Sequence, residues 1–200
     1  IGAMGSDAGP YLDWMKKKEI NTDYIKVIKD KYTAQAYIAT DKSSNQITIF
    51  HPGAMQYANE IKIPENDSIT LGIISPDGRD GMIEHTQQLI DMKVPYVFDP
   101  GQGMPMFNKE ELVFFTDNAS WVVMNDYEFK MYNEMTGYTP ADVIQNNKTL
   151  VITNGDQGSN IFTENKKLNI SAPKVDNPKD PTGCGDAYRA GIMYGIMNNM

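Results

Sequence analysis

A glycine-rich stretch near the end of the chain has residue types and spacing that suit phosphate chemistry. In Thr182-Gly183-Cys184-Gly185-Asp186, two glycines enclose a small residue directly before a predicted helix at Ala187–Met197. Such a loop lets the backbone approach an anion, and the free N–H groups of the first helical turn favour negative charge there. Asp186 lies in the same turn, where a carboxylate can accept a proton from a substrate hydroxyl. The pattern is also compatible with a simple turn whose Asp caps a helix.

Other phosphate- and metal-binding signatures are missing from the sequence. No Gly-x-x-x-x-Gly-Lys-Ser/Thr occurs, which excludes a P-loop enzyme, and Gly101-Gln102-Gly103 lacks the third glycine of a dinucleotide fingerprint. One cysteine and two histidines cannot supply a zinc site with proper spacing. His51 lies beside a Pro-Gly turn and His85 within a predicted helix, so we interpret both as structural or exposed.

The elements that must position these residues alternate between strand and helix. Short apolar strands are predicted at 68–74, 96–98, 121–124 and 150–153, helices at 81–92, 110–118, 126–135 and 139–145, and a β-hairpin at 159–170. This order favours an α/β fold with a doubly wound, mostly parallel sheet flanked by helices. Ligands of such sheets bind beyond the carboxyl ends of the strands. Five polar residues at predicted strand ends are therefore candidates for one site: Ser75, Asp77, Asp99, Asn125 and Asn154.

The first quarter of the chain has a different order of predicted elements. Pro10 is well placed to open a helix that runs to about Lys18. Residues 33–40 and 46–50 alternate and are β-prone, with a polar turn at 41–45 between them. These features predict a helix followed by a β-hairpin that ends at Pro52-Gly53.

Composition and charge limit the classes of function. The chain has 200 residues, with 40% hydrophobic and 22% charged residues, which is ordinary globular material for one α/β domain or one with a small appendage. A net charge of -8 disfavours nucleic acid and anionic membranes as partners, and no apolar run is long enough to span a bilayer. One cysteine precludes an intrachain disulfide and indicates a reducing, cytoplasmic location.

Asp180–Gly191 resembles the second signature of the ribokinase/PfkB family of carbohydrate and nucleoside kinases. The resemblance implies that Asp186 is the catalytic base and that the backbone of Gly183, Cys184 and Gly185 forms an anion hole. Cys184 stands where the family often has alanine, and we interpret it as a small filler. The expected fold is ribokinase-like, with a small β-sheet lid.

Further segments match the family in the right order. Asn125-Asp126-Tyr127-Glu128 is similar to the family's Asn-x-x-Glu motif, which implies that Asn125 and Glu128 organise Mg²⁺, through water, and phosphate. The turn that contains Asn154, Gly155 and Gly158 resembles the family's glycine turn beside the nucleotide. Asp99-Pro100 matches a family strand that ends in Asp-Pro. A helix N-cap and a tight turn before a hairpin are the alternative interpretations of the first two segments.

The hairpin resembles the lid strands of the adenosine-kinase-like bacterial branch, which implies adenosine as substrate and Gln46 and Phe50 as substrate contacts. The predicted domains are a core at 1–30 and 54–200 and a lid at 31–53. Lid strands often pair between subunits in this family, so a homodimer through the lid is an open expectation. The implied cofactors are ATP and Mg²⁺, with a monovalent cation left open. A sugar or sugar-phosphate kinase and a non-catalytic purine-binding protein remain alternatives.

Both ends of the sequence indicate a partial chain. Residues 2–6 have the composition of a cloning remnant, although Gly5-Ser6-Asp7-Ala8-Gly9 also resembles a family turn before a helix. The last predicted helix is still running at Met200. The family's upstream Asp and Gly-Gly motif, and the downstream elements that pack on adenine, have no match here.

Overall fold

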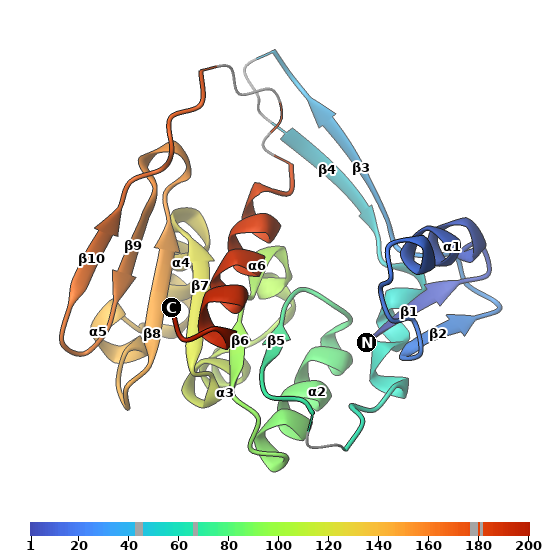
Figure 1. Ribbon diagram of the computed structural model, residues 1–200, viewed down its shortest axis with the longest axis horizontal. Helices are drawn as coiled ribbons and strands as arrows, with labels where there is room; N and C mark the ends of the chain where they lie inside the picture. The colour runs from blue at the N-terminus through green and yellow to red at the C-terminus, as the bar shows by residue number, and fades with distance from the viewer. Residues whose placement is uncertain (43–45, 66–67, 177–179, 181) are drawn as a thin grey trace. The chain divides into compact units, whose positions relative to one another are not determined.

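The computed structural model describes residues 1–42, 46–65, 68–176, 180 and 182–200. The chain folds into two compact units, residues 1–64 with 77–88 and residues 65–76 with 89–200 (Figure 1). Ser43–Asn45 of the predicted hairpin turn and Pro181 of the glycine-rich motif lie outside the described residues. The proposed boundaries of core and lid stay a prediction.

The second unit is built on a six-stranded sheet with the order β10-β9-β8-β7-β6-β5. The first four strands along the chain run parallel, and the last two form an antiparallel hairpin. Their bounds are β5 (Gly72–Ile74), β6 (Tyr96–Phe98), β7 (Trp121–Asn125), β8 (Thr149–Thr153), β9 (Ser159–Phe162) and β10 (Lys167–Ile170). The predicted α/β class with a mostly parallel sheet is confirmed.

Helices cover both faces of this sheet because strand residues alternate between them. Val97, Val123 and Val151 form one buried face, against which the apolar residues of α6 (Cys184–Met197) pack. The opposite face includes Phe98, which stacks on Phe115 of α3 (Lys109–Asn118) with ring centroids 5.0 Å apart. Figure 1 shows α6 in front of the sheet and α3 and α4 (Asp126–Thr136) behind it. The remaining helical segments of this region are η2 (Gly101–Met106), α5 (Pro140–Val143) and η3 (Gly155–Gln157).

The strand predicted at 68–74 is shorter than expected. β5 begins at Gly72, which pairs with Tyr96 in the register of β6. The residue before Tyr96 is Pro95, whose carbonyl accepts from the Gly72 N–H at 3.0 Å but which has no N–H to donate. The ladder therefore stops at this point.

The first unit contains two small sheets. β3 (Gln35–Thr40) and β4 (Gln46–His51) form the predicted antiparallel hairpin, which is followed by η1 (Gly53–Glu60). β1 (Gly2–Gly5) pairs in parallel with β2 (Ile25–Ile28), a sheet that the sequence analysis missed, and α1 (Gly9–Lys17) lies between them in the chain. α2 (Arg79–Asp91) contributes residues up to Gln88 to this unit.

Residues 2–5 are an integral strand of the fold and not a loose remnant. A Cβ on Gly5 would lie 2.2 Å from the backbone carbon of Tyr32, so only glycine fits there. The Gly5 N–H donates to Thr33 Oγ1 at 3.0 Å. This close packing explains why a small-residue segment forms a strand.

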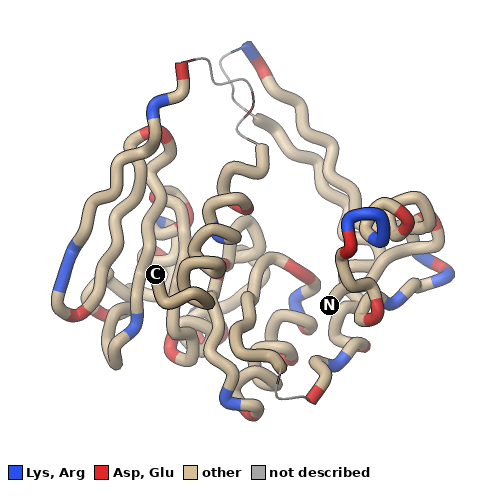
Figure 2. The backbone as a smooth tube through the Cα atoms, in the orientation of Figure 1, with Lys and Arg blue, Asp and Glu red and all other residues tan. Residues whose placement is uncertain are grey.

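Charged residues are distributed over the backbone of both units (Figure 2). The run Lys16–Lys18 at the end of α1 is a local basic group on an otherwise mixed or acidic chain with net charge -8. None of the helices in the described ranges combines the length and the apolar character needed to cross a lipid bilayer.

Candidate active site

The glycine-rich motif opens helix α6 without a side-chain cap. Gly183 is the N-cap residue in a left-handed conformation, with φ 79° and ψ -1°, and no side chain accepts from the first turn there. The N-termini of α3 and α4, in contrast, each carry a complete capping box. The first N–H groups of α6 are therefore available to an anion, and the helix dipole adds to their attraction.

Asp186 lies in that first turn with its side chain 89% exposed. Its Oδ1 is 3.9 Å from Nη1 of Arg189, one helical turn further on. Cys184 is exposed and carries a free thiol. The structure thus brings together the four residues predicted for catalysis, Gly183, Cys184, Gly185 and Asp186, on one open helix terminus.

A side chain is disfavoured at positions 183 and 185 of the motif for different physical reasons. Gly183 needs its left-handed backbone, and nothing lies within 4 Å of the position of a Cβ. Gly185 is an ordinary helical residue, but a Cβ there would lie 2.5 Å from Arg189 Nη1. The guanidinium group therefore occupies the space that a side chain at 185 would need.

Arg189 connects this helix to the carboxyl edge of the sheet. Its Nη2 donates to Asp99 Oδ1 at 2.8 Å, and its Nε lies in ion-pair contact with Asp99 Oδ2. Ser75 Oγ donates to the same Oδ2 at 2.8 Å. Burial raises the pKa of Asp99, and the positive charge of Arg189 opposes this rise. Ser75 and Asp99, predicted from strand ends, are thus in contact, whereas Arg189 was missed.

Asn125 and Glu128 form the capping box of α4. The Glu128 N–H donates to Asn125 Oδ1 at 2.7 Å, and the Asn125 N–H donates to Glu128 Oε2 at 2.8 Å. Glu128 is only 7% exposed. Burial raises its pKa most, the charge of Asp99 raises it further, and Arg189 lowers it. The two carboxylates and the guanidinium therefore share one electrostatic environment at the sheet edge.

The same four-residue pattern occurs a second time, at Asn108–Glu111, with the same reciprocal hydrogen bonds. Asn108 follows η2, whereas Asn125 is the last residue of β7. The cap thus explains the pattern in both places, and only the position at a strand end gives Asn125–Glu128 access to the site.

The oxygen atoms available at this edge of the sheet limit how a magnesium ion could be held. No group of three His, Cys, Asp or Glu residues with metal-site geometry exists among the described residues. Asn125 Oδ1 and Glu128 Oε2 already accept backbone hydrogen bonds. A site made of few protein oxygens fits Mg²⁺ because this ion usually keeps several waters and binds substrate phosphates. Asn125 and Glu128 would hold it through water.

The turn from Asn154 to Gly158 follows β8 at the same edge of the sheet. Gly155 has φ 55° with open space around it, which leaves its backbone accessible. A side chain at position 158 would clash with the backbone, because a Cβ there would lie 1.9 Å from the Ile170 carbonyl oxygen of β10. The Asn154 amide donates to the Ile152 carbonyl at 3.3 Å. Contact of this turn with a nucleotide stays a prediction.

Three other predicted residues belong to the first unit. Asp77 accepts from the Gly78 N–H at 2.7 Å, and burial raises its pKa. Gln46 donates to Thr40 Oγ1 at 3.3 Å across the hairpin, and Phe50 is 51% exposed on the same strand. The roles of Gln46 and Phe50 stay predictions.

The histidines have the structural or exposed character that was predicted. His85 is buried and its Nε2 lies 2.8 Å from the Ile61 carbonyl oxygen, while His51 is exposed on β4.

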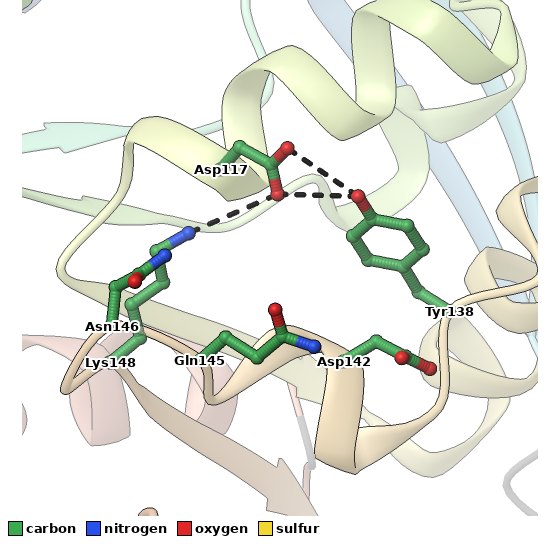
Figure 3. Close-up of a pocket in the computed structure, with 6 residues that line it drawn as sticks. All are labelled: Asp117, Tyr138, Asp142, Gln145, Asn146 and Lys148. Atoms are coloured by element: carbon green, nitrogen blue, oxygen red, sulfur yellow. Dashed lines mark hydrogen bonds and ion pairs between the residues drawn. The ribbon is translucent and has the colours of Figure 1, made fainter.

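A polar pocket of about 220 Å³ lies in the second unit away from these residues (Figure 3). One of its lining residues is Lys148, a buried lysine whose Nζ donates to the Thr116 carbonyl at 3.2 Å and lies 3.9 Å from Asp117 Oδ1. Desolvation lowers the pKa of Lys148, and Asp117 opposes this shift. The contacts fasten the end of α3 to the start of β8. The lining residues are Asp117, Tyr138, Asp142, Gln145, Asn146 and Lys148.

Comparisons with known proteins agree with this fold. A nucleoside kinase of Methanocaldococcus jannaschii is 31% identical over 183 residues, which cover 92% of this chain and 60% of that relative. The structure of Burkholderia thailandensis nucleoside kinase in complex with inosine matches with TM-score 0.95 and 41% identity, over 98% of this chain and 65% of that one. The same enzyme in complex with ADP-inosine matches with TM-score 0.93.

The chain therefore spans 60% of the length of the Methanocaldococcus jannaschii relative and 65% of the Burkholderia thailandensis chain. The model of the pfkB family of carbohydrate kinases matches residues 1–200. The fold, the open terminus of α6 and the family match lead to one conclusion: this chain belongs to the pfkB family of carbohydrate kinases.

Proposed function

We propose that the protein carrying this chain transfers the γ-phosphoryl group of ATP to the 5′-hydroxyl of a nucleoside. The observation that carries the proposal is the uncapped N-terminus of α6 with Asp186 in its first turn. Its relatives are named nucleoside kinases, and one was solved with inosine and with ADP-inosine. Purine nucleosides, adenosine first and inosine second, are therefore the substrates to test.

The reaction follows from the geometry of the terminus. Asp186 accepts the proton of the substrate hydroxyl as its oxygen bonds to the γ-phosphorus. The bond to the bridging oxygen breaks, and ADP leaves with the electron pair. The N–H groups of Cys184 and Gly185 stabilise the charge on the transferred group. Magnesium, when bound near Asn125 and Glu128, supplies positive charge that neutralises the phosphates.

The remaining contacts are assigned to the elements predicted for them. The turn at Asn154, Gly155 and Gly158 lies beside the nucleotide, and Gln46 and Phe50 on β4 contact the nucleoside. Pairing of the β3–β4 hairpin with that of a second subunit would cover its apolar residues, of which Ile47 is 73% and Ile49 is 69% exposed. A homodimer through this hairpin is part of the proposal.

Turnover by the full-length protein tests this function. Adenosine, inosine, ribose and fructose 6-phosphate are compared as acceptors with ATP and Mg²⁺, and ADP formation is measured. We expect nucleosides to be preferred, and Asp186→Asn to lower kcat by roughly 10²–10⁴-fold while ATP binding is retained. Preference for a sugar would identify a sugar kinase, and calorimetric binding of adenosine without ADP formation would identify a non-catalytic binder. Near-normal turnover by Asp186→Asn would refute the role of the base.

A further inference from the structure

The side chain of Arg189, a residue of helix α6, lies against the carboxyl edge of the sheet. This side chain is 16% exposed, and the Asp99 side chain that it contacts is 3% exposed. Asp99 is itself fixed, because Ser75 Oγ donates to its carboxylate and its backbone N–H donates to the Ile74 carbonyl at 2.8 Å. The guanidinium plane is thus tied to the ends of two neighbouring strands, β5 and β6.

The free side of the same guanidinium lies against the first turn of α6. Nη1 is 3.9 Å from Asp186 Oδ1 and fills the space beside Gly185. The group therefore contacts two parts of the candidate machinery at once, the carboxylate and the backbone that provides an N–H. The position of the guanidinium therefore bears on both of them.

We propose that Arg189 is a positioning residue, which transmits the fixed position of Asp99 to Asp186 and to the Gly185 N–H. The proposal rests on the proposed function, because it concerns the placement of the same base and anion hole. A lysine could keep the charge, but its ammonium lacks the planar fork that contacts Asp99 and Asp186 in fixed directions. Arginine is therefore required for geometry and not only for charge.

A purely structural role would predict something different. Helix α6 is also fastened by Tyr188, whose hydroxyl donates to Ser159 Oγ at 2.7 Å, and by its apolar contacts with the sheet. Removal of one partner of a buried ion pair leaves the other charge unpaired, so Arg189→Ala should also lower the stability of the fold. If Arg189 only anchored the helix, kcat of the folded Arg189→Lys protein, which keeps the charge, would stay near wild type, as it should in Tyr188→Phe.

The experiment compares Arg189→Lys, Arg189→Ala, Ser75→Ala and Tyr188→Phe in the full-length protein, with kcat, KM and thermal unfolding measured for each. We expect Arg189→Lys to lower kcat by roughly 10- to 100-fold, with KM values for nucleoside and ATP within about threefold of wild type. Tyr188→Phe should lower the unfolding temperature but leave kcat near wild type. Free guanidinium ion should restore part of the turnover of Arg189→Ala, since a purely structural defect would not respond to it.

Each outcome has a defined meaning. Should Arg189→Ala fail to fold, Ser75→Ala tests the same chain of contacts, and we expect its kcat to fall by about two- to fivefold. If the wild-type protein turns over nucleoside and kcat is unchanged in Arg189→Lys and Ser75→Ala, the positioning role of Arg189 is overturned but the proposed function stands. Wild-type protein without any nucleoside turnover would overturn the proposed function, and the inference with it.

Discussion

Arg189 lies where a side chain at Gly185 would have to be. The separation between Nη1 and a Cβ built at 185 is 2.5 Å, below any real contact distance. Gly185 is helical and has no positive φ, so alanine would otherwise be favoured there by about 1 kcal/mol. A side chain at 185 would therefore have to displace the guanidinium of Arg189 from its present position.

This relationship predicts that Gly185→Ala and Arg189→Ala are not additive. Alanine at 185 displaces the guanidinium, so each single variant should lose the same placement of Asp186. We expect kcat of the double variant to be within about threefold of that of Arg189→Ala, as a double-mutant cycle measures. Independent falls in kcat that multiply in the double variant would contradict the contact.

Gly183→Ala provides the contrast. Nothing lies near its missing Cβ, but its φ of 79° strains any other residue by roughly 1–3 kcal/mol. The loss of stability should therefore be the same with and without Arg189. Thermal unfolding of both pairs of proteins checks this, and a loss that disappears in Arg189→Ala would count against backbone strain as the cause.

The two Asn-x-x-Glu segments allow a matched test of the proposed magnesium site. Glu128→Gln and Glu111→Gln each alter a capping box, and glutamine still fits the N3 position. Both should therefore change stability by less than about 1 kcal/mol. Only Glu128→Gln should raise the Mg²⁺ concentration needed for half-maximal turnover, by roughly tenfold. Equal Mg²⁺ dependence in the two variants would limit Glu128 to its capping role.

The β3–β4 hairpin offers neighbouring residues on opposite faces. Phe50 and Ile49 are consecutive in β4, so their side chains point to opposite sides of the hairpin. We expect Phe50→Ala to raise KM for the nucleoside about tenfold, which corresponds to ~1.4 kcal/mol, without changing KM for ATP. Ile49→Ala is the control and should leave both values near wild type when its oligomeric state, measured alongside, matches that of wild type. An equal rise of KM for nucleoside and ATP in Phe50→Ala would argue against a substrate contact.

The sheet was predictable where the sequence is apolar over a short run. Residues 96–98 and 121–124 were recognised because buried parallel strands are hydrophobic on both faces. β1 was missed because Gly2-Ala3-Met4-Gly5 is poor in β-branched residues, and it forms a strand through pairing with β2 and close packing on Tyr32. Such tertiary support leaves no local signal.

The residues of the candidate site also differ in how far the sequence predicts them. Asp186 and its glycines are contiguous, so their spacing was compatible with an anion-binding turn or a simple capped turn, and the family resemblance favoured the first. The contact of Arg189 with Asp99 joins residues 90 positions apart, and only the fold reveals it. A signal was present, because arginine three residues after Asp186 lies one helical turn away, but the sequence could not show which carboxylate it meets.

The hydrogen bonds of Asp7 predict how a fall in pH changes the stability of the first unit. The Thr33 backbone N–H and hydroxyl both donate to Asp7 Oδ1 at 2.8 Å, and these hydrogen bonds lower the pKa of Asp7 below its ordinary value of 3.8. A lowered pKa in the folded state stabilises the fold above the ordinary pKa, and this contribution is lost as pH falls through the lowered value. Wild type should therefore unfold at a higher temperature than Asp7→Asn near pH 6, and the difference should shrink below pH of about 3.8. Thr33→Val keeps the backbone donor to Asp7 but also loses the acceptor of the Gly5 N–H, so only the pH-dependent part of its difference from wild type should be smaller than in Asp7→Asn, with the same direction. A gap that widens on acidification would refute the assignment.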